Sequence, residues 1–159
     1  MIKERHYCDS CVFLGVLNNE PGKFHDCRTL LQAADEGVID LFTSAFTMAE
    51  VIKIKGEVEL DESKEHIIDQ LFKQPWIKIA NFEREMGQIC RSITWKYNLK
   101  PYDALHLATA IRLRVNFFNT TDKPLISKLP THIGHTPDYS GVVIQWPCVN
   151  GYSPPLFFE

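Results

Sequence analysis

The chain has 159 residues, of which 45% are apolar and 23% are charged, close to the average for globular proteins. It contains no run of about 18 apolar residues, so we expect no membrane-spanning helix. Polar residues follow the apolar stretch at residues 11–17 where a cleavage site should be, so we also expect no export signal. The net charge of −3 and the pI near 6.1 exclude a broad basic surface, and any nucleic-acid site must be local or metal-assisted.

In chain order, the first half predicts a strand at residues 5–8 and a helix opened by Asp9 and Ser10. A helix with apolar residues at three-and-four spacing runs from about residue 23 and ends at Gly37. A buried strand at residues 38–44 and a helix over residues 47–54 follow. These short elements therefore alternate between strand and helix.

The second half continues this alternation, with a helix over residues 63–72, a strand at 76–80, helices over 82–97 and 101–113, and strands at 115–119 and 142–146. Continuously apolar strands that alternate with helices form parallel sheets covered on both faces. We therefore predict an α/β fold over residues 1–159 as a single domain. Its architecture is a three-layer α/β/α sandwich with a five-stranded parallel, Rossmann-like sheet.

The five cysteines are an odd number without the spacing of a disulfide framework, which predicts free thiols and a cytoplasmic protein. Cys8 and Cys11 resemble half a zinc knuckle, but we interpret them as small buried residues at the junction of a strand and a helix. His132, His135 and Asp138 also have ligand-like spacing. Prolines flank this segment, and we interpret it as a loop without a zinc site.

Four acidic residues fall at or near the carboxyl ends of predicted strands, where open parallel sheets collect their chemistry. Asp9 follows the first strand, and Glu50 lies on the helix after the second. Asp103 opens the helix before the fourth strand, and Asp122 follows that strand. Each also has a simpler interpretation: Asp9 and Asp122 as helix or turn caps, Asp103 as a favourable charge at a helix N-terminus, and Glu50 as a partner of Lys53.

Convergence of these carboxylates would need a cation. Two unit charges about 4 Å apart repel by about 4 kcal/mol at an effective dielectric constant of roughly 20. Several such pairs would remove much of a typical folding stability of about 5–15 kcal/mol. Oxygen ligands suit hard ions, so one or two Mg²⁺ or Mn²⁺ ions are expected rather than zinc. Such a site can hydrolyse phosphodiesters, and it would attract a polyanionic substrate despite the negative net charge of the protein.

Four ordered motifs resemble those of the PIN-domain family: YCDS at residues 7–10, SAFTMAE at 44–50, PYDALHLATA at 101–110 and NTTD at 119–122. The resemblance covers about residues 6–147. It implies a metal-dependent endoribonuclease that cuts single-stranded RNA and leaves 5′-phosphate and 3′-hydroxyl ends. Many small members are VapC-type toxins, which implies an antitoxin partner and a homodimer.

Carried over by position, the resemblance assigns the metal-binding and catalytic roles to Asp9, Glu50, Asp103 and Asp122, and supporting hydroxyls to Ser10 and Thr121. Pro124 stands where many members have a further polar residue, which leaves the number of ions open. His106, one turn after Asp103, could position a phosphate or a water, or pack against the sheet edge. Lys100 and Lys123 flank two of the acids and are candidates for guiding RNA. The apolar tail at residues 152–158 could dock on this domain or on a partner.

Two other function classes compete with the nuclease. The same fold with an idle site could serve as a scaffold or an RNA-binding subunit, although such a protein has no need of four converging acids. A nucleotide-dependent Rossmann enzyme is poorly supported, because neither G-x-G-x-x-G nor a P-loop motif occurs. A phosphoaspartyl hydrolase requires a second Asp two places after Asp9, and Cys11 is there instead.

Overall fold

A sheet of six strands forms the centre of the computed structural model, which describes residues 1–52 and 60–155. Across the sheet the described strands are β3 (Ile77–Ala80), β2 (Asp40–Ser44), β1 (Arg5–Cys8), β4 (Phe117–Asn119), β6 (Val142–Gln145) and β5 (His132–Ile133). The first five are parallel, and β5 runs antiparallel to β6. The five predicted parallel strands are confirmed, and β5 is an addition.

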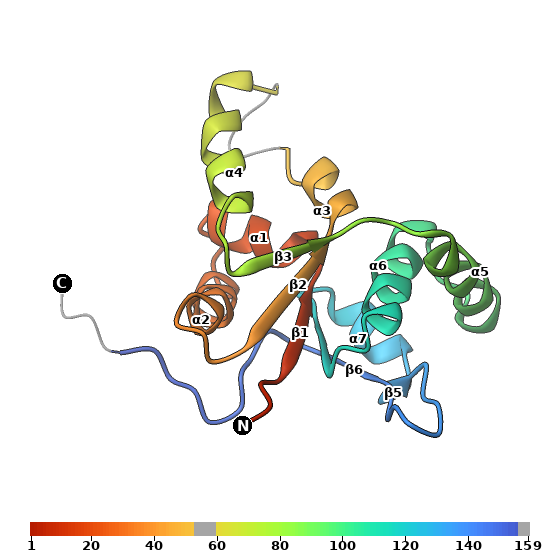
Figure 1. The fold of residues 1–159 in the computed structure, drawn as a ribbon. Helices are drawn as coiled ribbons and strands as arrows, with labels where there is room; N and C mark the ends of the chain where they lie inside the picture. The colour runs from red at the N-terminus through yellow and green to blue at the C-terminus, as the bar shows by residue number, and fades with distance from the viewer. Residues whose placement is uncertain (53–59, 156–159) are drawn as a thin grey trace.

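Helices cover both faces of the sheet (Figure 1). Helices α1 (Ser10–Leu17), α2 (Phe24–Asp35) and α4 (Glu65–Phe72) lie on one side, and α5 (Arg84–Tyr97), α6 (Pro101–Arg112) and α7 (Lys123–Lys128) on the other. Helix α3 (Ala45–Glu50) follows β2 directly at the carboxyl end of the sheet, and a 3₁₀ turn (Glu62–Lys64) precedes α4. The predicted α/β/α sandwich is therefore the observed architecture.

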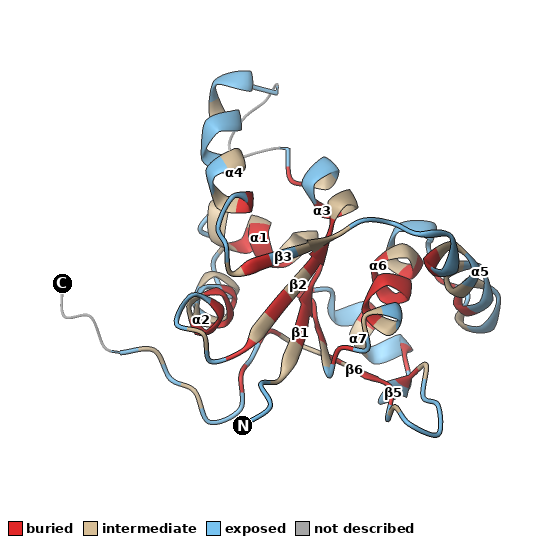
Figure 2. Ribbon diagram, in the orientation of Figure 1, coloured by how far each residue is buried: buried red, intermediate tan, exposed pale blue. Residues whose placement is uncertain are grey.

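Strand β1 lies in the middle of the sheet, and this position explains its burial. Tyr7 is paired with Phe42 of β2 and with Phe118 of β4, and its side chain has no exposed surface. The Tyr7 and Phe118 rings stack with centroids 5.3 Å apart. Figure 2 shows the buried residues concentrated on the central strands and on the helix faces turned toward them. Each face of the sheet accordingly has its own apolar core.

Helix α3 ends at Glu50, four residues before the predicted end at residue 54. Val51 leaves the helical conformation with φ −87° and ψ 75°, and its side chain is completely buried in the core beside α1 and α2. Burial of this apolar side chain therefore outweighs one more turn of helix. As a result, Glu50 is the last residue of α3 rather than a residue in its middle.

The loop predicted around His132 is wrong for its first two residues. His132 and Ile133 form β5, which pairs with Val143 and Val142 of β6. Ile133 is 1% exposed, so its burial holds the short strand in place. Gly141 has a φ of 86°, and a Cβ there would lie 2.8 Å from the Ile133 carbonyl oxygen. Only glycine allows this close approach of the two backbones.

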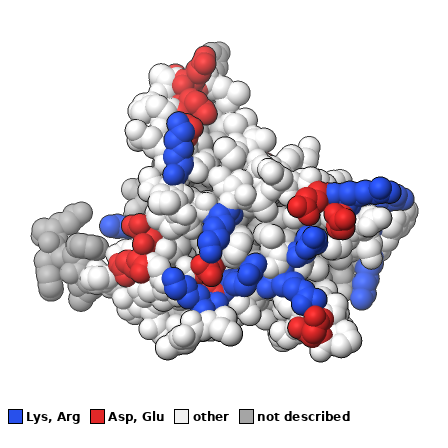
Figure 3. Space-filling view, in the orientation of Figure 1, with Lys and Arg blue, Asp and Glu red and all other residues white. Residues whose placement is uncertain are grey.

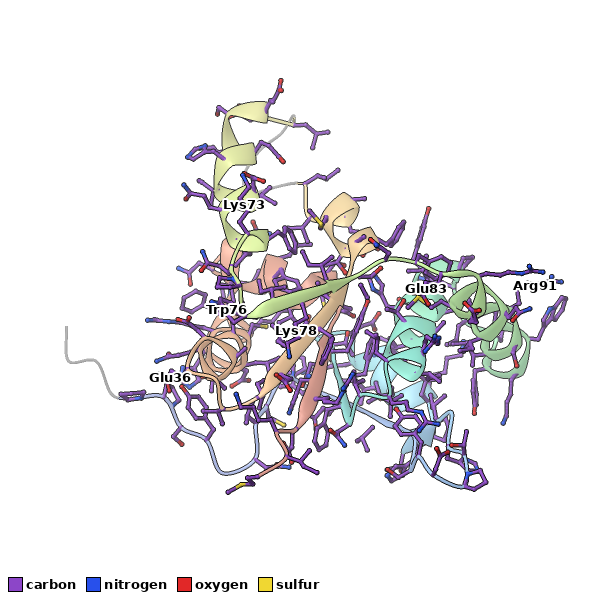
Figure 4. All side chains as sticks on the ribbon, viewed as in Figure 1. Glu36, Lys73, Trp76, Lys78, Glu83 and Arg91 are labelled. Carbon is purple, nitrogen blue, oxygen red and sulfur yellow. The ribbon has the colours of Figure 1, made fainter. Side chains whose placement is uncertain are left out.

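Charged side chains of both signs are interspersed on the face shown in Figure 3. Several are paired, among them Lys78 with Asp40 at 2.6 Å and Lys73 with Asp69 at 2.5 Å. Figure 4 shows Lys78 in front of the sheet, where it reaches from β3 to β2. Pairing of this kind offsets part of the basic charge locally.

After β6 the chain crosses to the side of α2 (Figure 1). The Trp146 indole N–H donates to Asp26 Oδ2 at 2.7 Å, and Tyr152 packs against the core on this side. The start of the apolar tail thus docks on its own chain, and residues 156–159 lie outside the described residues. All five cysteines are free. Across the described part of the chain, no helix is long and apolar enough to cross a membrane.

Candidate functional site

Asp9 lies directly after β1, where the strand gives way to α1. Its Oδ1 accepts hydrogen bonds from the backbone N–H of Cys11 at 3.1 Å and from the Cys11 thiol at 2.5 Å. Asp9 therefore caps α1, which is the simpler role that its position in the sequence suggested. The residue is 8% exposed, and burial raises the pKa of its carboxyl group. An ionised Asp9 is thus costly unless a positive charge lies close to it.

The Cys11 thiol connects the end of β1 with the end of β4. Besides donating to Asp9, its sulfur accepts from the Thr121 backbone N–H at 3.1 Å and lies 3.3 Å from the Thr120 hydroxyl. Burial, followed by the charge of Asp9, raises the pKa of the thiol, which keeps it protonated and able to donate. Reasoning from the sequence missed this role, because the C-x-x-C pattern suggests only half a zinc knuckle or two small buried residues. The signal available in the sequence was the position of Cys11 two residues after Asp9, the residue expected to cap the helix.

Asp122 caps the next helix on the same edge of the sheet. Its Oδ1 accepts from the Leu125 backbone N–H at 3.0 Å, and its own N–H donates to the Thr120 hydroxyl at 3.1 Å. The turn predicted there extends into α7. The hydroxyl in this network belongs to Thr120, whereas Thr121 takes part through its backbone N–H to Cys11. Ser10 is the first residue of α1 and is half-buried.

Glu50 is held by a histidine from another element. His106 Nε2 lies 2.6 Å from Glu50 Oε2, and His106 Nδ1 lies 2.7 Å from the Tyr7 hydroxyl. Burial strongly raises the pKa of Tyr7, so its hydroxyl stays protonated and donates to Nδ1. With the ring hydrogen on Nε2, His106 donates to Glu50 Oε2 and accepts at Nδ1 from Tyr7. His106 is 3% exposed and faces the acidic residues while it packs beside the sheet, and Lys53 lies outside the described residues.

Asp103 and Asp122 share one pocket. The pocket has a volume of about 190 Å³, and Lys100, Pro124, Leu125 and Lys128 also line it. The pKa of Asp103 is raised by burial and by the negative charges of Asp122 and Glu50, which outweigh the opposing effects of Lys100 and His106. Lys100 thus belongs to this pocket. The Lys123 ammonium lies over the Trp146 ring at 5.4 Å from its centroid.

The described side chains at this edge of the sheet do not form a complete coordination shell for a metal ion. No group of three or more His, Cys, Asp or Glu side chains in residues 1–52 and 60–155 lies close enough together to hold one ion. The donor set nevertheless fits a hard cation, because it is made of carboxylates and because Asp9 and Asp103 have raised pKa values. A positive charge in the pocket would relieve both the burial and the mutual repulsion. Drawing these side chains into one shell would require them to move.

The fold and this site define an α/β protein with an acidic pocket at the carboxyl edge of a parallel sheet. A sequence model of the PIN domain matches residues 6–129 of the chain. The chain belongs to the PIN domain family, whose members are generally nucleases that depend on divalent metal ions. The resemblance inferred from the four motifs is therefore confirmed.

Several solved structures share this fold, and two of them illustrate the match. One is described as a toxin–antitoxin complex from Klebsiella pneumoniae, and it matches with a TM-score of 0.57 and 20% sequence identity, over 79% of this chain and 92% of that one. The other is described as FitAB bound to an IR36 DNA fragment, and it matches with a TM-score of 0.59 and 16% identity, over 89% and 94% of the two chains. No curated protein sequence matches the chain. At these identities the structural likeness concerns the fold alone.

Proposed function

We propose that the protein is an endoribonuclease that hydrolyses single-stranded RNA with Mg²⁺ or Mn²⁺, and that it is the toxin of a toxin–antitoxin module. Membership of the PIN domain family supports the nuclease activity. The observation that carries the proposal is the pocket shared by Asp103 and Asp122, together with the negative charge of Glu50 that reaches Asp103. The two similar structures, both described with antitoxin or DNA partners, support the toxin assignment and an antitoxin partner.

Each acidic residue has a distinct task in this proposal. Asp9, Asp103 and Asp122 would hold one or two ions, and Glu50 would hold an ion or orient the attacking water. When bound, the ion supplies activation of water and neutralisation of the scissile phosphate. His106 keeps Glu50 Oε2 engaged, so this task would fall to the other carboxylate oxygen. Lys100, in the pocket lining, is placed to attract a phosphate.

Asp103→Asn tests the activity. The substitution keeps the size of the side chain and removes one negative charge from the pocket, so we expect cleavage of single-stranded RNA with Mg²⁺ or Mn²⁺ to fall at least about 100-fold. Asp35→Asn is the matched control, because Asp35 is an exposed carboxylate at the end of α2, on the other side of the sheet from α6 (Figure 1). Undiminished cleavage by Asp103→Asn would refute the assignment.

Binding of Mn²⁺ is measured on the same proteins by calorimetry and by thermal unfolding. A ligand that binds only the folded state raises the melting temperature, so we expect Mn²⁺ to stabilise the wild type and the Asp35→Asn control, and EDTA to reverse this effect. Asp103→Asn should lose most of the shift. If the wild type binds RNA but shows no metal-dependent cleavage, the protein is an RNA-binding or scaffold member of the family instead.

A further inference from the structure

Two aromatic rings stack beside the proposed active site. Phe46 of α3 and Tyr102 of α6 have ring centroids 5.5 Å apart and planes 18° apart. Phe46 is half-buried, and its ring also lies 5.9 Å from the His106 ring. Tyr102 is 62% exposed. The pair is therefore a ledge, in which Phe46 is anchored on the protein and Tyr102 faces solvent.

Helical spacing places this ledge next to the acidic residues. Phe46 and Glu50 are four residues apart on α3, and Tyr102 and His106 are four residues apart on α6. Residues at this spacing lie on one face of a helix, one turn apart. The contact between the two helices thus has two successive levels, the stacked rings and the hydrogen bond from His106 to Glu50. Tyr102 also directly precedes Asp103 in the chain.

We infer that the Phe46–Tyr102 ledge is a nucleobase subsite, where a base of the single-stranded substrate stacks on the exposed face of Tyr102. This inference rests on the proposed function. An exposed aromatic ring beside a phosphate-binding site is the usual device by which proteins hold single strands, because every base presents a flat face. Bases in a duplex are already stacked on one another, so the subsite selects an unpaired nucleotide.

Tyr102 directly precedes Asp103, which lines the pocket together with Lys100. When a phosphate of a single RNA strand lies in that pocket, a neighbouring base of the same strand can stack on the Tyr102 ring. The overall negative charge of the protein gives little general attraction for RNA, so a local stacking contact supplies affinity that charge does not.

The test combines Tyr102→Leu with an abasic scan. A short dye-labelled single-stranded RNA, and copies in which one base at a time is removed, are titrated with protein in Ca²⁺, a hard cation in place of Mg²⁺, and binding is followed by anisotropy. We expect Tyr102→Leu to bind the intact strand about 10-fold more weakly and Tyr102→Phe to bind like the wild type. The Mn²⁺ affinity of Tyr102→Leu should not change. Trp95→Leu, at an 85% exposed aromatic on α5, is the matched control and should bind normally.

The scan identifies the base that is in contact. For the wild type, removal of one base should weaken binding about 10-fold, and at that position Tyr102→Leu should show no further loss. Because the scan of the wild type alone must show such a position, the test also holds if the variant fails to fold. The inference would be overturned if the wild-type scan shows no such position or if Tyr102→Leu binds RNA as tightly as the wild type. An equal loss of binding in Trp95→Leu would also overturn it, as would a change in the oligomeric state of Tyr102→Leu without a change in its RNA affinity. A wild type that neither binds nor cuts RNA would refute the proposed function itself, whereas metal-dependent cleavage with unaltered binding by Tyr102→Leu would refute the subsite alone.

Discussion

At the scale of single residues, the Cys11 thiol determines how Asp9 is presented. It donates to Asp9 Oδ1 and accepts the Thr121 N–H, so one sulfur atom ties the end of β1 to the segment that leads into Asp122. A protonated thiol suits both contacts at once. Cys11 is therefore a positioning residue for two of the proposed metal ligands.

Replacement of Cys11 tests this role. Cys11→Ala removes a donor to a buried carboxylate and leaves the Thr121 N–H without its acceptor, so we expect a loss of about 1–3 kcal/mol in the free energy of unfolding and weaker Mn²⁺ binding. Cys11→Ser retains a donor and an acceptor and should recover part of both losses. Urea unfolding and calorimetry measure the two effects. Equal Mn²⁺ affinities in the Ala and Ser variants would show that the thiol has only a packing role.

At the scale of elements, β1 supplies three consecutive residues that link its neighbours. His6, Tyr7 and Cys8 lie beside β4, and the Asn119 side-chain amide donates to the His6 ring at 3.1 Å and to the Tyr7 carbonyl at 3.1 Å. His6 Nδ1 accepts from this amide, so the ring is neutral with its hydrogen on Nε2, facing Glu4 at 3.4 Å. A proton on Nδ1 would meet the hydrogen of the Asn119 amide. Burial accordingly lowers the pKa of His6, despite the neighbouring Glu4.

This environment predicts a loss of stability in mild acid. The unfolded chain takes up a proton on His6 as the pH falls through about 6.5, whereas the folded protein does so only at lower pH. The unfolded state then binds more protons, and the free energy of unfolding decreases from pH 7 toward pH 5. His6→Gln removes the titrating group, so its unfolding free energy should fall less steeply over this range. Parallel curves for the two proteins in chemical denaturation would contradict the prediction.

At the scale of the whole molecule, the two apolar cores on opposite faces of the sheet both anchor residues at its carboxyl edge. The core beside α1 and α2 includes Cys8 and Val51, which flank Asp9 and Glu50 in the chain, and the core beside α6 and α7 includes Ala104 and Leu125, near Asp103 and Asp122. The acidic residues thus come from loops and helix ends anchored in both cores. Loss of packing on either side of the sheet is therefore expected to disturb the site.

The toxin assignment also belongs to this scale, and it predicts growth arrest. Expression of the chain in a bacterial host should stop growth, because cleavage of cellular RNA blocks translation, and Asp103→Asn should relieve the arrest at equal protein level. Colony counts after induction measure the effect, with Asp35→Asn as the control that remains toxic. Coexpression of the product of a neighbouring short open reading frame should restore growth if that product is the antitoxin. Normal growth with a nuclease that is active in vitro would exclude a toxin.

The sequence by itself determined the alternation of strands and helices, the five parallel strands, the membership of the PIN domain family and the placement of the acids near the strand ends. Periodicity and motif spacing are local properties, so they can be recognised without knowing the packing. Only the tertiary structure decided that α3 stops at Glu50, that β5 joins the sheet, and that Cys11 and His106 hold Asp9 and Glu50. His106 meets Tyr7 across 99 positions and Glu50 across 56, and contacts of that range depend on how two cores fill space, which no local pattern records.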